Sequence, residues 1–216
     1  MRIGIEASAV CASSRRPGSE NRLQGNIDVQ PDLELVSVRR DESFKAGITA
    51  FRTARCWHFH PEFEIHLIVA TTGNMFVGDY IGSFAPGNLV LMGPNLPHNW
   101  VSEVPEGVTI AQRNLVVQFG QDFVAHCTDN FPEWRTLEAL LEDSRRGVSS
   151  GAQTSAAIQP LFMELLEARG LRRIVLFLSI RPAMRRRAST TCCHISARSS
   201  RRNCASPISR NARARA

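Results

Sequence analysis

The chain has 216 residues and a mass of 24.0 kDa, enough for one domain of ordinary size with or without a tail. A hydrophobic fraction of 43% is sufficient for a core and excludes disorder throughout the chain. No stretch approaches 18 uncharged apolar residues, so a transmembrane helix is excluded. Residues 1–18 lack the apolar segment of a secretory signal, and we therefore expect a cytoplasmic protein.

The net charge of +6 is distributed unevenly along the chain. Residues 1–180 carry 16 basic residues against 20 acidic ones, a net charge of −4, whereas residues 181–216 carry 10 arginines and no acidic residue. The pI of 9.5 therefore comes from the last segment. It does not indicate nucleic-acid binding by the protein as a whole.

The first part of the chain divides into a polar segment and a series of short strands. Residues 1–30 mix Ser, Arg, Gly and Asn without periodicity, and we expect a disordered lead-in. Short apolar runs separated by Gly and Pro then predict strands at Leu33–Arg39, Ala46–Thr53, Glu64–Ala70, Met75–Tyr80, Asn88–Met92 and Val108–Phe119. Closely spaced strands without intervening helices indicate an antiparallel sandwich or barrel.

From residue 120 the hydrophobic period changes to that of helices. Pro132 suits the first turn of a helix that carries Leu137, Leu140 and Leu141 on one face and ends at Gly147. Ser155–Arg169 predicts a second helix, whose start Pro160 leaves open. Leu171–Ile180 begins a third, and its apolar pattern then stops.

Residues 181–216 consist mainly of Arg, Ala, Ser and Cys and have almost nothing to bury. We expect a disordered, Arg-rich tail. A shifted reading frame in GC-rich DNA yields this composition, and we favour that origin. The alternative is a basic arm that binds nucleic acid or an acidic partner.

The most informative segment for chemistry runs from Cys56 to His66. Alternate positions carry polar side chains (His58, His60, Glu62, Glu64 and His66), and the positions between them carry mainly apolar ones (Trp57, Phe59, Phe63 and Ile65). One face would pack into the protein while the other presents imidazoles and carboxylates. We expect Pro61-Glu62 to interrupt the strand, and we expect His66, outside the motif, to be a structural or surface residue.

A second segment, from Pro86-Gly87 to His98, contains a turn, a short apolar strand and another turn before the histidine. His58, His60, Glu64 and His98 together would provide three nitrogen ligands and one oxygen ligand. Such a set suits Fe, Mn, Ni or Zn as the divalent ion. The alternative is that these side chains line a ligand site that holds no metal.

The spacings His-x-His-x3-Glu and Gly-x10-His resemble the two motifs of the cupin superfamily, which are double-stranded β-helix (jelly-roll) barrels. The resemblance implies that His58, His60, Glu64 and His98 are the site residues. The sequence departs from the motifs where Arg52 replaces a leading glycine and where Ser102 replaces a closing asparagine.

Over a longer span, about residues 33–178, the order of elements resembles the amino-terminal half of AraC-family transcription regulators. The phrases that carry this resemblance are His58-x-His60, Glu64-Ile65, Pro86-Gly87-x-Leu89-Val90-Leu91, Pro94-Asn95-Leu96-Pro97-His98-x-Trp100 and Leu137–Gly147. The resemblance implies a mainly β fold with C-terminal helices: a cupin-like barrel over residues 31–127, two to three α-helices over 128–180 for dimerisation and linkage, and a tail over 181–216.

The function implied is small-molecule sensing, with a sugar as the expected ligand at His58, His60, Glu64, His98 and Trp100. Trp100 would stack on the sugar, although a core or rim role for it is an equal alternative. We expect a homodimer, no catalytic residues and no membrane contact. DNA would be bound only through a helix-turn-helix domain that this chain lacks. The alternative function is a stand-alone metal-dependent cupin enzyme, a dioxygenase or sugar isomerase.

Overall fold

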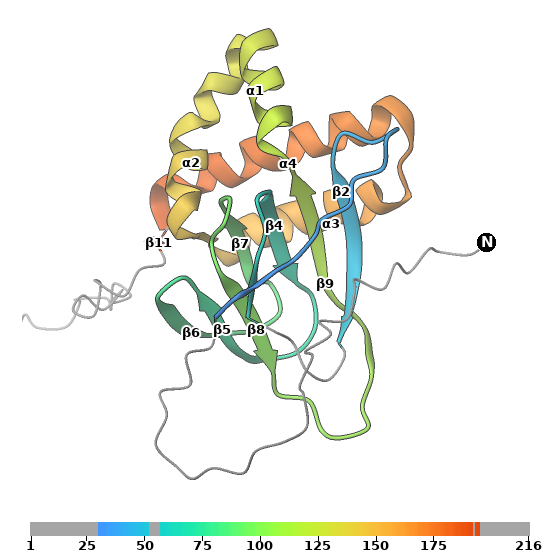
Figure 1. Ribbon diagram of the computed structural model, residues 1–216, viewed down its shortest axis with the longest axis vertical. Coiled ribbons are helices and arrows are strands. Elements are labelled where there is room, and N and C mark those ends of the chain that lie inside the picture. The colour runs from blue at the N-terminus through green and yellow to red at the C-terminus, as the bar shows by residue number, and fades with distance from the viewer. Residues whose placement is uncertain (1–29, 52–56, 192, 195–216) are drawn as a thin grey trace, which may run out of the picture.

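The computed structural model describes residues 30–51, 57–191 and 193–194 (Figure 1). The strands are β1 (Asp32–Leu33), β2 (Lys45–Phe51), β3 (His58–Phe59), β4 (Phe63–Ile68), β5 (Gly73–Val77), β6 (Tyr80–Phe84), β7 (Leu89–Met92), β8 (His98–Ser102), β9 (Ile110–Phe119), β10 (Val148–Ser150) and β11 (Cys193–His194). The helices are α1 (Gln121–Asn130), α2 (Glu138–Asp143), α3 (Ala152–Glu167) and α4 (Gly170–Thr191), with 3₁₀ turns at Pro132–Leu137 and Ser144–Arg146.

The strands form two sheets. One has the order β1-β3-β8-β5-β6 and the other the order β11-β10-β7-β4-β9-β2. Within the described residues all pairs are antiparallel except β1 with β3. The expectation of a mainly β fold followed by helices is confirmed. The expected closure into a barrel is not seen, because no strand pairing among the described residues joins the two sheets.

The six-stranded sheet has one face against the helices. Every second side chain of β4 faces the helices, as the period of two in a strand requires: Phe63, Ile65 and Leu67. They join a core with residues of β7 and β9 and with the buried faces of the helices, among them Phe162 and Phe177. Figure 1 shows α3 and α4 crossing behind the strands of this sheet.

The other set of alternating residues in β4 faces away from the helices, and one of them contributes to a second, smaller core. Ile68 packs there with residues from both sheets: Met75, Val77, Phe84, Val90, Met92 and Trp100. Glu64 and His66 share the parity of Ile68 and are also buried. The alternation of β4 therefore places these two polar side chains on the side of the second core, away from the helices.

The helical part differs from the sequence expectation in two places. α1 was not predicted; its sequence is polar and only Cys127 is buried among its residues, so it has no apolar stripe to recognise. The helix expected from Pro132 begins as a 3₁₀ turn and becomes α-helical only at Glu138. With α1 there are four α-helices in the described part of the chain, rather than two or three.

The last helix continues past the boundary that the sequence predicted at residue 180. α4 runs to Thr191, and Cys193–His194 pairs with Val148–Ser149 of β10. Ala, Met and Arg in this segment are good helix formers and favour the extension, which continues through Pro182. The rest of the expected tail, and residues 1–29 of the expected lead-in, lie outside the described residues.

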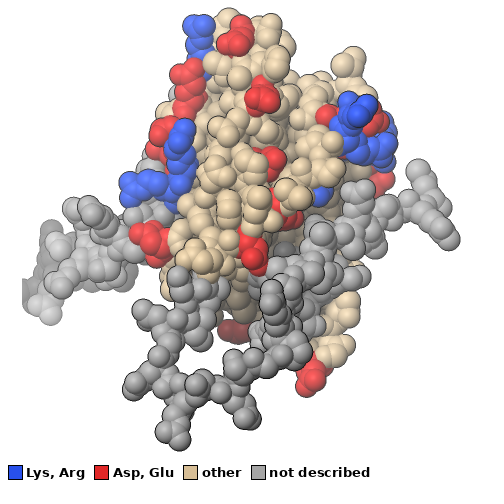
Figure 2. All heavy atoms as spheres, in the orientation of Figure 1, with Lys and Arg blue, Asp and Glu red and all other residues tan. Residues whose placement is uncertain are grey.

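Residues 1–180 carry a mildly acidic net charge of −4, and side chains of both signs lie on the surface (Figure 2). On the face seen in Figure 2, basic and acidic side chains lie next to one another over the helical part of the molecule. Within the described residues, none of the helices combines the length and the apolar character that a membrane span needs.

Candidate metal centre

Three strands bring the motif residues together: β3 and β4, which follow each other in the sequence, and β8 from farther along the chain. β3 ends at Phe59 and β4 begins at Phe63, which confirms the predicted interruption at Pro61-Glu62. β3 pairs with β8 so that His58 lies directly opposite His98. The bend after β3 carries His60, and β4 carries Glu64 back toward it.

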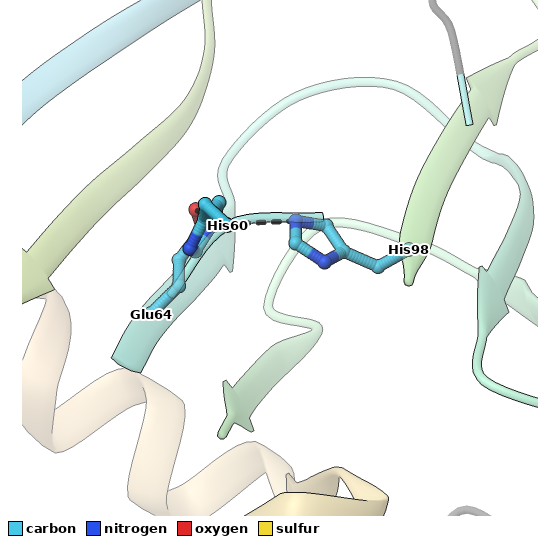
Figure 3. A group of neighbouring side chains, drawn as sticks. All are labelled: His60, Glu64 and His98. Carbon is cyan, nitrogen blue, oxygen red and sulfur yellow. Dashed lines mark hydrogen bonds and ion pairs between the residues drawn. The ribbon is translucent and has the colours of Figure 1, made fainter. Parts of the chain in front are cut away.

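Three of the four predicted ligands converge: His60, Glu64 and His98 (Figure 3). His60 Nε2 lies 3.0 Å from Glu64 Oε2, and His98 Nε2 lies 3.9 Å from Glu64 Oε1. All three residues are buried, with exposed fractions of 1 to 3%. One ligating atom from each lies within 4.8 Å of the others.

Backbone carbonyls fix the orientation of both imidazoles. His98 Nδ1 donates to the carbonyl of Leu96 at 2.8 Å, and His60 Nδ1 faces the carbonyl of Glu62 at 3.2 Å. A neutral imidazole with Nδ1–H engaged carries its lone pair on Nε2. His98 Nε2 is buried and has no hydrogen-bond partner in the described part of the chain. This nitrogen is therefore available to a metal ion.

The charge states of His98 and Glu64 suit cation binding, whereas His60 would have to give up a proton to bind an ion. Burial lowers the pKa of His98 to about 3, so its ring is neutral at pH 7. Burial opposes ionisation of Glu64, but hydrogen bonds with His60 and His66 outweigh it and hold the pKa of this carboxyl well below its usual value. Burial also opposes the charged form of His60, yet the hydrogen bond with Glu64 and its charge raise the pKa of this imidazole.

His58, the fourth predicted ligand, is close to the cluster but turned away from it. Its ring centroid lies 4.3 Å from that of His98, whereas its Nε2 lies 3.1 Å from Glu34 Oε2. This hydrogen bond lowers the pKa of Glu34. The side chains of His58 and Glu34 are 17% and 28% exposed, more than those of His60, Glu64 and His98.

Trp100 lies in the core between the sheets. It is 2% exposed, its ring stacks on His66 with centroids 4.0 Å apart, and its Nε1 donates to Asn88 Oδ1 at 3.3 Å. The predicted stacking on a sugar would have to use the other face of the indole. His66 itself is buried, which excludes the predicted surface position, and its Nδ1 lies 2.7 Å from Glu64 Oε1.

Two residues of the site, Glu34 and Gln118, were not predicted from the sequence. Gln118 lies opposite Glu64 in the pairing of β4 with β9 and donates from Nε2 to Glu64 Oε2 at 2.9 Å. The one available signal was the alternation along β9, where Gln118 interrupts the apolar run of Val117 and Phe119. Glu34 reaches His58 because β1 runs alongside β3, and no local pattern shows this.

The donor set fits a small divalent ion. Two imidazole nitrogens and a carboxylate oxygen bind Zn, Fe, Ni or Mn at about 2.0–2.2 Å, so two ligands of one ion lie at most about 4.2 Å apart. The observed limit of 4.8 Å requires only a small inward movement of the side chains. Three protein ligands would leave coordination positions for water or a small molecule.

Comparison with known proteins gives matches among solved structures only, since no protein-family model and no curated protein matches the chain. One similar structure is a cupin 2 conserved barrel domain protein from Rhodopseudomonas palustris, with a TM-score of 0.31 and 16% identity over 48% of this chain and 75% of that chain. Another is a cupin 2 conserved barrel domain protein from Salinispora arenicola, with the same TM-score and identity over 52% and 98% of the two chains.

Proposed function

We propose that the chain is a ligand-sensing domain of the AraC type that holds a divalent metal ion through His60, Glu64 and His98. The single observation that carries the metal site is the buried Nε2 of His98, which lies beside an ionised carboxylate and has no hydrogen-bond partner in the described residues. A buried polar atom without a partner costs about 1–3 kcal/mol. An ion at this point would satisfy it.

A small molecule would reach the ion from the side of His58 and Glu34. These two side chains are the more exposed members of the site. The ion would supply a Lewis acid that binds an oxygen of the ligand. His58 and Glu34 can hydrogen-bond to neighbouring hydroxyl groups, which supports a sugar or another polyol as the ligand.

The helices after the sheets support a sensor rather than a stand-alone enzyme. α4 presents exposed apolar side chains at Leu171, Val175 and Leu178, spaced as one face of a helix. A barrel that only catalyses a reaction does not need such a face. In a sensor, a second copy would cover it, and ligand binding would shift the equilibrium between arrangements of the pair.

The alternative, a metal-dependent enzyme, uses the same site. Three protein ligands leave open positions, which a dioxygenase or sugar isomerase also needs. The two functions differ in turnover: a sensor binds its sugar without converting it. Incubation of the metal-loaded protein with a panel of sugars, followed by mass analysis of the mixture, separates them.

The metal site is tested by titrating the full, EDTA-treated chain with Zn²⁺ in a calorimeter. We expect one equivalent to bind, and we expect His60→Ala and His98→Ala to remove binding. His126→Ala is the matched control, because His126 is an exposed histidine on α1 whose Nδ1 hydrogen-bonds within its own helix. Wild-type affinity in His98→Ala, or no binding by the wild-type chain, would overturn the metal site.

A further inference from the structure

Glu64 is held at both of its carboxylate oxygens by side chains outside the metal-ligand set. His66 Nδ1 lies 2.7 Å from Oε1, and Gln118 Nε2 donates to Oε2 at 2.9 Å. Both partners are buried, with exposed fractions of 4% and 5%. An ionised carboxylate accepts hydrogen bonds and donates none, so His66 must carry its proton on Nδ1.

His66 is fixed in turn by the aromatic core. Its ring stacks on Trp100 with the two planes 10° apart, and the indole Nε1 of Trp100 donates to Asn88. The ring cannot rotate away from Glu64 without losing this stack. A series of contacts therefore runs from Asn88 through Trp100 and His66 to Oε1 of Glu64.

Gln118 is placed by strand register. β9 pairs with β4 so that Gln118 lies directly across from Glu64, and the side chains of such a pair lie side by side. Its Nε2 also lies 3.5 Å from His60 Nε2. Gln118 therefore presents an amide donor at the junction of Glu64 and His60, on the opposite side of the carboxylate from His66.

We infer that His66 and Gln118 are positioning residues that hold the Glu64 carboxylate toward the Nε2 atoms of His60 and His98. This inference rests on the proposed metal site. With a donor at each oxygen, the carboxylate cannot turn freely. Groups that orient a metal ligand commonly change metal affinity roughly 10- to 100-fold when they are removed.

Two substitutions of His66 separate the hydrogen bond from the aromatic stack. His66→Phe keeps a ring against Trp100 but removes the donor to Glu64, whereas His66→Asn keeps an N–H near the position of Nδ1 and removes the ring. Gln118→Met removes the second donor at nearly the same length. His126→Phe, on the exposed side of α1, is the matched control.

The experiment measures Co²⁺ binding to the full chain by competition with a chelator, together with the visible absorption of the bound ion. We expect His66→Phe and Gln118→Met to bind roughly 10- to 100-fold more weakly and with an altered spectrum. His66→Asn should stay within about threefold of the wild type, because it keeps the hydrogen-bond donor. Urea unfolding of each metal-free variant shows whether it folds.

The outcomes distinguish the inference from the function on which it rests. Wild-type affinity and spectrum in both His66→Phe and Gln118→Met would overturn the positioning role while leaving the metal site in place. Wild-type affinity in His66→Phe together with a loss in His66→Asn would also overturn the role of the His66 hydrogen bond, because the ring alone would then matter. No Co²⁺ binding by the wild-type chain would overturn the metal site and the positioning role together.

Discussion

His58 and His98 lie directly opposite each other in the pairing of β3 with β8, with ring centroids 4.3 Å apart, yet their Nε2 atoms serve different partners. His98 directs Nε2 toward Glu64, and His58 directs Nε2 to Glu34. The two-residue strand β1, which precedes Glu34, therefore decides whether His58 is available to the cluster.

If His58 is a fourth metal ligand, as the sequence motif predicts, Glu34 competes with the ion for it. A partly exposed ion pair is worth about 0.5–1 kcal/mol, so we expect Glu34→Gln to strengthen Zn²⁺ binding about two- to fivefold. Calorimetric titration measures the change, with Glu106→Gln, an exposed acid between β8 and β9, as the control. An unchanged affinity would show that His58 does not ligate the ion.

Acidification should destabilise the metal-free protein through His98. The pKa of His98 is about 3 in the folded state and 6.5 ordinarily. Between these two pH values the imidazole is protonated in the unfolded chain but not in the folded chain. Stability therefore falls as the pH drops from 6.5 toward 3, by up to about 1.4 kcal/mol per pH unit.

His98→Gln should flatten this dependence. Urea unfolding in EDTA between pH 6.5 and 5 stays above the ordinary pKa of 4.5 for Glu64, and His60, whose pKa is raised, contributes in both proteins. The change in slope between variant and wild type is the measured quantity. Parallel slopes would contradict a neutral, buried His98.

Phe177 joins α4 to the sheet core, and its loss should be costly. Its ring stacks on Phe44 with centroids 4.4 Å apart and meets Phe119 edge-on at 5.2 Å. We expect Phe177→Ala to lower the free energy of unfolding by about 3–5 kcal/mol. Met163→Ala, at a position on α3 that is 42% exposed, should cost less than about 1 kcal/mol. If both substitutions lowered the free energy of unfolding equally, Phe177 would not be the main core contact of α4.

The exposed apolar face of α4 should hold two copies together. We expect the wild-type chain to sediment as a dimer and the double substitution Leu171→Ser, Val175→Ser to sediment as a monomer with unchanged helix content. Phe131→Ser is the control, because Phe131 is an exposed apolar residue between α1 and the following 3₁₀ turn. A dimer that survives the double substitution would place the interface on another surface.

The sequence predicted the parts of this protein that depend on local pattern. Pro61 predicted the interruption at Pro61-Glu62, and the period-two alternation predicted the shared face of Glu64 and His66. The change to a helical period gave α3 and the beginning of α4. Such patterns are readable because a side chain's direction follows from its own strand or helix.

The tertiary structure decided which of these side chains meet. Strand register placed Gln118 across from Glu64, and the edge strand β1 brought Glu34 to His58, so that only three of the four predicted ligands direct their ligating atoms to one point. Contacts between residues far apart in sequence depend on how whole strands pack and pair. That pairing follows from burying both cores at once, and no single segment of the sequence determines it.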